Sequence, residues 1–187
     1  MKPVNDLLRI EDLGVGITMQ SGQLEAVKSA SLRVLPGKVT ALVGESGSGK
    51  SVIAQTILGI LPPVAKVTKG RILFNDPERP GSSIDLCQLD RDSEAYRALR
   101  GQRISMIFQE PMTALSPLHT VGNQIQEALT IHTSLPEAEA RRRTEEMLDL
   151  VGFPDPQRAY GMYPFELSGG LRQRAVIAMA LICRPAL

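Results

Sequence analysis

The residues with the clearest chemistry form one continuous glycine-rich stretch: Gly44, Glu45, Ser46, Gly47, Ser48, Gly49, Lys50 and Ser51. This stretch fits the pattern G-x-x-x-x-G-K-[ST] of phosphate-binding loops. Its glycines allow successive backbone N–H groups to point at one anion, and a helix that starts at the end of the loop adds the positive end of its dipole. Lys50 is predicted to reach the β- and γ-phosphates, and the Ser51 hydroxyl to coordinate Mg²⁺. The stretch therefore predicts a site for a nucleoside triphosphate with Mg²⁺.

A second stretch with two glycines opens the last predicted helix, residues 168–183. Ser168 is predicted to be the N-cap of this helix, and Gly169 and Gly170 leave its N-terminus open to close approach. The stretch is therefore a second candidate anion site. Because a predicted helical segment separates it from the first site, one chain is not expected to fold the two together.

The elements around the phosphate loop follow from apolar runs and turn residues. Residues 39–43 form an apolar, β-branched run, which predicts a strand buried on both faces of a parallel sheet. Residues 50–61 carry apolar side chains at helical spacing, and Pro62 is expected to stop that helix. Short strands are expected over residues 7–10, 26–27 and 71–74, and the polar residues 76–98 are expected to lie on the surface.

The rest of the chain predicts one more strand and then helices. The strand is expected over residues 104–108. Ser134 and Glu137 fit a capping box, so a helix is expected to begin there and to end at Gly152. The basic residues 141–143 lie among glutamates, a pattern typical of a solvated helix face rather than of a nucleic-acid patch.

Composition excludes several classes of protein. The 187 residues contain 21 Lys and Arg against 20 Asp and Glu, and a formal charge of +1 gives no general attraction to nucleic acid or anionic lipid. The longest apolar run, residues 175–183, is far shorter than the roughly 20 residues that span a bilayer. Neither a transmembrane helix nor a signal peptide is expected, and the two cysteines, Cys87 and Cys183, fit a reducing compartment.

Two motifs resemble those of a known family. Residues 163–174, which contain Leu-Ser-Gly-Gly, resemble the signature motif of the ATP-binding-cassette (ABC) ATPases. Gln109, at the end of a predicted strand and before Glu110 and Pro111, resembles the Q-loop of that family. The resemblance implies a head-to-tail dimer, in which each ATP lies between the phosphate loop of one subunit and the signature of the other.

The resemblance also assigns roles to residues. Lys50 and Gln109 would be catalytic, because the family's Q-loop glutamine contacts Mg²⁺ and the attacking water. Ser51 and Gln109 would bind the metal. Residues 44–51 and 168–170 would bind ATP, with the signature of Ser168, Gly169 and Gly170 acting in trans.

Residues 108–117 and 172–180 narrow the resemblance to the bacterial subfamily of oligopeptide, dipeptide, glutathione and nickel importers. The implied fold is an α/β P-loop NTPase, here incomplete, with N-terminal antiparallel strands and a helical subdomain. Residues 1–111 would form the RecA-like ATP-binding core with its β-subdomain, and residues 112–187 the helical subdomain with the signature.

The implied function is ATP-driven uptake of peptides or similar small solutes. The implied partners are transmembrane permease subunits, a second ATP-binding subunit and, indirectly, a solute-binding protein, but no nucleic acid. Such a subunit would lie peripherally on the cytoplasmic face of the bacterial inner membrane. The solute itself, and whether the dimer is homomeric or heteromeric, are not encoded in these motifs.

The sequence departs from the family pattern in three places. Leu171 replaces the glutamine common at the end of the signature, although hydrophobic residues are usual there in this subfamily. The adenine-stacking aromatic would fall near Ile17 or Met19, and neither is aromatic. The Walker B strand and the switch histidine would follow Leu187, so the chain is expected to be an N-terminal fragment that does not hydrolyse ATP alone.

Other interpretations of the chain stay open at this stage. A soluble ABC ATPase of DNA repair or translation is disfavoured, because no heptads lie between the two motifs and the charge is balanced. An inert truncated product is a third possibility. His119 and His132 are isolated, which favours surface roles over metal binding. The apolar residues just past Gln109 could either pack in the core or receive a helix from a membrane subunit: Met112, Leu115, Leu118 and Val121.

Overall fold

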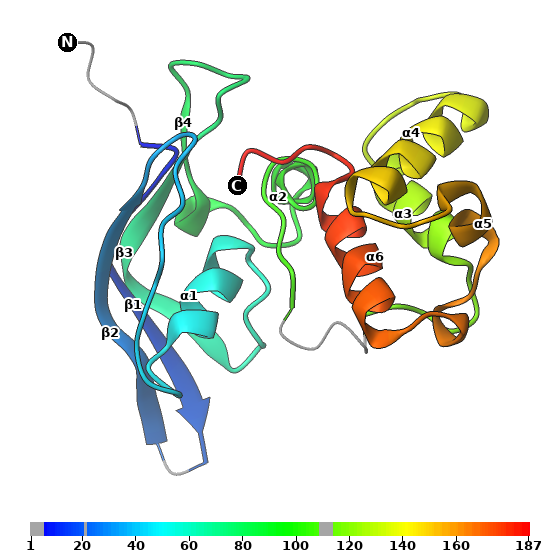
Figure 1. Ribbon diagram of the computed structural model, residues 1–187. Coiled ribbons are helices and arrows are strands. Elements are labelled where there is room, and N and C mark those ends of the chain that lie inside the picture. The colour runs from blue at the N-terminus through cyan, green and yellow to red at the C-terminus, as the bar shows by residue number, and fades with distance from the viewer. Residues whose placement is uncertain (1–5, 21, 109–113) are drawn as a thin grey trace. The chain divides into compact units, whose positions relative to one another are not determined.

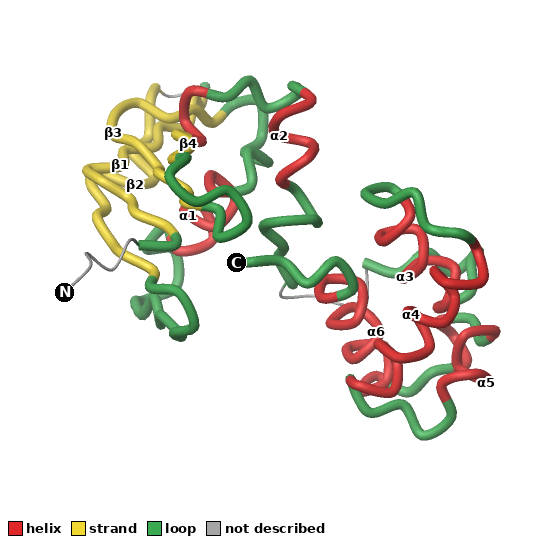
Figure 2. Tube along the Cα trace, turned by 90° about the horizontal axis from the view of Figure 1, so that it is seen from above, coloured by secondary structure: helices red, strands yellow, loops and turns green. Residues whose placement is uncertain are grey.

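The computed structural model describes residues 6–20, 22–108 and 114–187. The chain divides into two compact units, Met1–Arg97 and Ala98–Pro185. The named strands of the described chain all lie in the first unit, and helices build the second (Figures 1 and 2). This order agrees with the expected N-terminal antiparallel strands and helical subdomain. The predicted boundary between residues 111 and 112 lies outside the described residues.

The first unit contains a four-stranded antiparallel sheet. Its strands are β1 (Leu8–Met19), β2 (Gly22–Val34), β3 (Ala65–Asn75) and β4 (Ser83–Asp85), in the spatial order β2-β1-β3-β4. The strands expected near residues 7–10, 26–27 and 71–74 are confirmed as parts of longer ones. The sheet buries an apolar set that includes Leu8, Ile10, Leu13, Val15, Ile72 and Phe74.

Helix α1 (Lys50–Ile57) follows the phosphate loop and faces this sheet (Figure 1). It begins where the sequence predicts, and it buries Ile53 and Thr56. It ends before the expected stop at Pro62, because Gly59 takes a left-handed φ of 62° just past the last helical turn.

Most residues of the polar segment 76–98 are exposed, as predicted, but the segment also forms regular structure and buries a few of its side chains. The segment contains β4, the 3₁₀ turn η1 (Leu86–Gln88) and most of helix α2 (Glu94–Leu99). Leu86 and Tyr96 are almost fully buried. The Tyr96 hydroxyl lies 3.2 Å from the carbonyl oxygen of Ile57, to which it donates, so this segment covers the C-terminal end of α1.

Residues 39–43 do not form the predicted buried strand. They pair with no strand of the described chain, and Val39 and Val43 are 99% and 88% exposed. The reason is physical, because a strand in the middle of a parallel sheet needs a hydrogen-bonded neighbour on each side. The apolar run is present, but the described residues supply neither neighbour.

Residues 104–108 form only the start of the predicted strand. Ile104 is buried, whereas Ile107 and Phe108 are about half exposed. The Leu187 N–H donates to the Arg103 carbonyl (3.2 Å), and the Ser105 N–H donates to the Leu187 carbonyl (2.9 Å). These two bonds flank Ile104 as the bonds between parallel strands do. The strand prediction is therefore wrong in extent for the described chain, although its first residues have a partner.

The second unit packs four helices around an aliphatic core. The helices are α3 (Val121–Thr130), α4 (Glu137–Leu150), α5 (Pro156–Gly161) and α6 (Gly169–Leu181). A 3₁₀ turn, η3 (Pro164–Glu166), leads into α6. The core contains, among others, Val121, Ile125, Leu129, Ala140, Leu148, Ala175 and Ala178.

The start of α4 corrects the predicted capping box. The N-cap is Pro136, without a side-chain cap hydrogen bond, and the helix begins at Glu137. A residue that precedes a proline is held in an extended conformation, so Leu135 cannot be the first helical residue after a Ser134 cap. The end of the helix is as predicted, because Gly152 has a φ of 85°.

Candidate functional site

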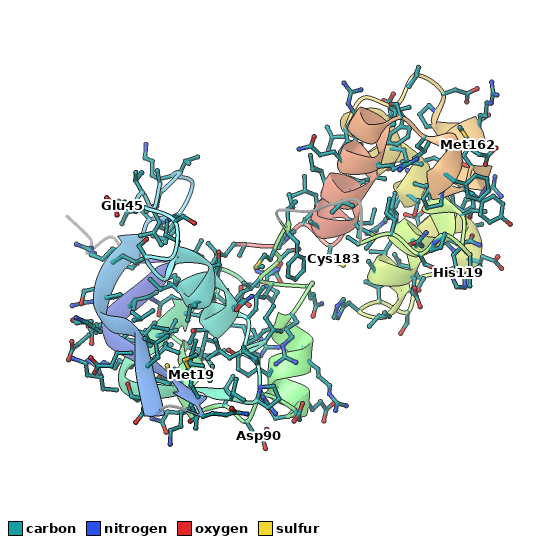
Figure 3. The ribbon with its side chains drawn as sticks, turned by 90° about the horizontal axis from the view of Figure 1, so that it is seen from below. Met19, Glu45, Asp90, His119, Met162 and Cys183 are labelled. Atoms are coloured by element: carbon teal, nitrogen blue, oxygen red, sulfur yellow. The ribbon has the colours of Figure 1, made fainter. Side chains whose placement is uncertain are left out.

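The phosphate loop connects β2 to α1 in the first unit, and residues 44–48 are exposed. Glu45 lies on the exposed side of this loop (Figure 3). Gly47 and Gly49 have φ values of 80° and 92°, a region that glycine adopts without strain. Gly49 is also the N-cap of α1. The two glycine conformations turn the chain so that the helix starts directly at Lys50.

Lys50 folds back into the loop that precedes it. Its Nζ donates to the carbonyl oxygens of Gly44 (2.8 Å) and Glu45 (2.6 Å) and to Ser48 Oγ (3.3 Å). These partners lie within six residues of Lys50, so local contacts alone close the loop. An ammonium group placed among backbone groups at a helix N-terminus attracts an anion. The predicted residues 44–50 are thus brought together in one site.

Gly49 also fixes the loop against the sheet. A Cβ atom at this position would lie 2.7 Å from the carbonyl oxygen of Ala26 and 3.0 Å from Cγ2 of Val27, both in β2. At Gly47 a Cβ would meet nothing within 4 Å. Gly49 is therefore required for close contact with β2, whereas Gly47 is required only for its backbone conformation.

Ser51 stands exposed in the first turn of α1. Its hydroxyl oxygen is a hard ligand of the kind that Mg²⁺ accepts, and this ion commonly reaches proteins together with substrate phosphates. The described residues contain no group of three or more His, Cys, Asp or Glu that could hold a metal ion by themselves. A hydroxyl beside a phosphate loop fits an ion that the phosphates share. Gln109, the other predicted metal ligand, lies outside the described residues.

The second candidate anion site is the N-terminus of α6. Ser168 is its N-cap, as predicted, and the Ser168 side chain accepts a hydrogen bond from the Leu171 N–H (3.4 Å). Gly169 and Gly170 are exposed, and a Cβ at either position would meet nothing within 4 Å. The three predicted residues therefore form one open surface in the second unit.

Two arginines of α6 bond backbone carbonyls of segments that precede the helix. The Arg172 Nε donates to the Pro164 carbonyl (2.7 Å), and Arg174 donates to the carbonyl of Gly152. Arg172 therefore ties the start of α6 to the preceding turn η3. Sequence reasoning did not predict this role, although both arginines stand in the stretch that resembles the signature.

The apolar residues that follow Gln109 in the sequence differ in their exposure to solvent. Leu115 and Val121 are buried in the helical core, whereas Leu118 is 80% exposed. Met112 lies outside the described residues. Gln124 fixes the turn from α3, because its side chain bonds the backbone N–H of Ser116 (2.8 Å) and the carbonyl of His119 (2.9 Å). Sequence reasoning missed both α3 and this glutamine, although Thr120 is a recognisable N-cap for the helix.

The remaining candidates have structural roles. His119 lies beside α3 (Figure 3), with its Nδ1 3.1 Å from Ser116 Oγ. Burial raises the pKa of the Cys87 thiol to about 11 and also raises the pKa of Cys183. Both thiols therefore stay protonated near neutral pH, and a protonated thiol is a poor nucleophile.

The exposed face of α4 carries the predicted ion pairs. Arg142 bonds Glu139 (2.7 Å) and also pairs with Glu146, Arg143 bonds Glu139 (3.0 Å), and Arg141 bonds Glu145 (2.9 Å). Hydrogen bonds from Arg142 and Arg143 lower the pKa of Glu139 to about 2. Paired charges of this kind confirm the solvated helix face.

The positions expected to meet adenine carry aliphatic side chains. Ile17 is half-buried, and Met19, at the end of β1, is 51% exposed (Figure 3).

In the part of the chain that the structure describes, no helix has the length and apolar character to span a membrane.

Comparison with known proteins agrees with this geometry. The sequence family described as "ABC transporter" matches residues 27–187. The dipeptide transport ATP-binding protein DppD of Bacillus subtilis is 50% identical over 180 residues, which are 96% of this chain and 51% of DppD. The glutathione import ATP-binding protein GsiA of Salmonella paratyphi A is 42% identical over 183 residues, which are 97% of this chain and 29% of GsiA. The chain thus spans about half the length of DppD and less of GsiA.

A solved structure shows the same fold. The dimeric structure of a post-hydrolysis state of the ATP-binding cassette MJ0796, bound to ADP and Pi, superimposes with a TM-score of 0.78 and 26% identity. The match covers 95% of this chain and 70% of MJ0796.

Proposed function

The chain belongs to the ABC transporter family, and from this membership we propose that it is the ATP-binding part of a bacterial importer for peptides or similar small solutes. The observation that carries the proposal is the Lys50 ammonium group held inside the glycine loop at the start of α1. The names of the relatives DppD and GsiA supply the solute class. Dipeptides and glutathione are both short, peptide-like solutes.

Lys50 and the loop would bind the phosphates of ATP. Upon binding, the phosphate oxygens would replace the carbonyl oxygens of Gly44 and Glu45 as partners of the Lys50 ammonium. The N–H groups of the loop and of the first turn of α1 would then surround the same anion. Charge that develops on the transferring phosphoryl group would meet positive groups already in place, which is the main protein contribution to phosphoryl transfer.

Ser51 would be the metal ligand of this site, with Gln109 as the second ligand. When bound, Mg²⁺ neutralises negative charge on the β- and γ-phosphates. The Ser51 hydroxyl follows Lys50 in the first turn of α1, so the same helix would orient the ammonium group and the metal ligand.

The open N-terminus of α6 would act on ATP held by a second subunit. Ser168, Gly169 and Gly170 present exposed backbone at a helix N-terminus, which suits a γ-phosphate arriving from outside the chain. The neighbour MJ0796 is described as dimeric with ADP and Pi, which supports this arrangement. Closing of the dimer on ATP would move the permease subunits, and hydrolysis would reset them.

Permease subunits would hold the protein at the cytoplasmic face of the membrane. The turn around Leu118 is one exposed apolar point that could meet them, because Gln124 fixes its backbone and leaves the leucine in solvent. A solute-binding protein outside the membrane would deliver the solute to the permeases.

The test is Lys50→Ala in the full-length protein, assembled with its permease subunits in vesicles. Loss of the charge-assisted contact is expected to abolish ATP hydrolysis and dipeptide uptake together. Lys66→Ala, which removes an exposed lysine of β3, is the matched control and should leave both activities unchanged. Unaltered hydrolysis in the Lys50 variant would contradict the assignment of the phosphate site. Hydrolysis stimulated by nickel but by neither dipeptides nor glutathione would contradict the proposed class of peptide-like solutes.

A further inference from the structure

Tyr163 and Phe165 form an exposed aromatic pair at the entrance to α6. Their ring centroids lie 5.4 Å apart and their planes differ by 9°. Phe165 is 67% exposed and Tyr163 is 38% exposed. The chain has only four Phe and three Tyr, all among the described residues, and Phe165 is the most exposed of them. Because apolar rings are normally buried, a stacked pair kept in solvent suggests a binding surface.

The backbone beneath this pair is fixed on both sides. The Tyr163 N–H donates to the Glu166 carboxylate (2.7 Å), and the Glu166 N–H donates to the Tyr163 carbonyl (3.0 Å). Pro164, which separates the two aromatic residues in the sequence, is buried, and its carbonyl accepts a hydrogen bond from Arg172 (2.7 Å). The rings therefore stand on a rigid turn, so little ordering is needed when a ligand binds.

The pair lies next to the residues proposed to bind phosphate in trans. Phe165 precedes Ser168 by three residues, so their Cα atoms lie within about 11 Å of each other. A nucleotide whose γ-phosphate meets Ser168 has its base a comparable length away along the triphosphate and ribose. The exposed Phe165 ring therefore belongs to a residue within one nucleotide length of the residue proposed to meet the γ-phosphate.

The phosphate-loop unit offers no ring for the base from its first two strands. Residues 6–34 contain no Phe, Tyr or Trp, and the candidate positions are Ile17 and Met19. Aliphatic side chains can contact a base but lack the π-face that stacks on it. The ring missing from one subunit is thus present, exposed and preorganised next to the signature of the other.

We infer that Phe165, supported by Tyr163, is a stacking platform for the purine base of the ATP held by the second subunit of the dimer. The inference rests on the proposed function, because it requires the head-to-tail dimer. Stacking responds to the size of the ring system rather than to its hydrogen-bonding edge. The platform therefore favours purine over pyrimidine nucleoside triphosphates.

The test uses the full-length protein with ATP or CTP and without Mg²⁺, so that dimers form without hydrolysis. Sedimentation velocity measures the nucleotide concentration that gives half-maximal dimer. F165A is expected to raise this concentration for ATP by roughly 5- to 150-fold, and to raise it less for CTP. The control L150A removes a leucine that is 74% exposed at the end of α4, and it should change neither value. The nucleotide affinity of the monomer should be the same in all variants.

A second variant gives a direct optical signal. Residues 1–187 contain no Trp, so the fluorescence difference between F165W and the unmodified protein reports on this position. ATP should quench the new indole only at protein concentrations at which dimers form. Normal ATP-driven dimers of F165A, together with an unquenched F165W, would overturn the inference and leave the proposed function standing. Loss of permease binding in F165A with unchanged ATP dependence would also overturn it, by assigning the pair to a membrane partner. Failure of the unmodified protein to dimerise with ATP would refute the proposed function itself.

Discussion

Replacement of Gly49 by alanine should damage the phosphate loop much more than replacement of Gly47. Both glycines have left-handed backbone conformations, with φ values of 92° and 80°. An alanine in this region costs roughly 1–2 kcal/mol at either position. Gly47→Ala adds nothing further, because its Cβ would enter open space.

Gly49→Ala carries a second cost from the contact with β2. Its Cβ would lie 2.7 Å from the Ala26 carbonyl oxygen, a backbone atom of β2 between the paired residues Glu25 and Val27, which can move away only if the strand shifts. Overpacking of this kind typically costs about 1–3 kcal/mol. The two costs together come to roughly 2–5 kcal/mol. The free-energy loss of the Gly49 variant should therefore exceed that of the Gly47 variant by about 1–3 kcal/mol, which is a factor of about 5 to 150 in an equilibrium constant.

The free-energy cost can lower either the stability of the protein or its affinity for ATP, so the assay measures both. Denaturant unfolding of the full-length protein without nucleotide gives the loss of stability, and calorimetric titration with ATP gives the loss of affinity. A loop that stays in place lowers stability, and a loop that shifts away from β2 lowers affinity. The prediction concerns the sum of the two free-energy losses. Equal sums for Gly47→Ala and Gly49→Ala would refute the argument that contact with β2 positions the loop.

Three further predictions concern other parts of the chain. Ser168→Arg should leave ATP binding by the monomer nearly intact and prevent the ATP-driven dimer, because the side chain blocks the N-terminus of α6; sedimentation that still shows the dimer would contradict binding in trans. Glu139→Gln should lower stability most above pH 4.5 and progressively less as the pH falls toward 2, because the lowered pKa of Glu139 reflects its hydrogen bonds to Arg142 and Arg143; melting curves of both proteins from pH 6 to pH 3 measure this difference. Cys87 should resist alkylation at pH 8 in the folded protein, because burial raises its pKa to about 11, and rapid labelling followed by mass spectrometry would contradict that burial.

The sequence predicted those helix ends whose signals are local. Ser168 and Gly152 have the capping roles expected of them, because a cap depends on a few neighbouring residues. The same rule explains the failure at α4. The Ser134 and Glu137 pattern was correct in spacing, but Pro136 between them prevents the helical conformation of the preceding residue.

The segment 76–98 contains buried residues that the local sequence does not reveal. Leu86 and Tyr96 are apolar residues in a charged stretch, and no periodicity marks them as buried. Tyr96 has its partners far away in sequence, because its hydroxyl bonds the carbonyls at the end of α1. Contacts of this kind depend on the assembled unit and leave no pattern in the local sequence.

The candidate site was more predictable than the sheet expected to carry it, because the two depend on contacts of different range. Lys50 closes the phosphate loop with partners at positions 44, 45 and 48, so the loop forms although residues 39–43 before it are unpaired. The predicted strand at 104–108 shows what those residues lack. It acquires two hydrogen bonds only where Leu187, some eighty positions later, reaches it in the pattern of a parallel strand. A parallel strand takes its neighbours from distant segments, and DppD is about twice as long as this chain. A nucleotide site built on short-range contacts can therefore be predicted from the sequence. The sheet that carries it depends on contacts between residues that are far apart in the sequence.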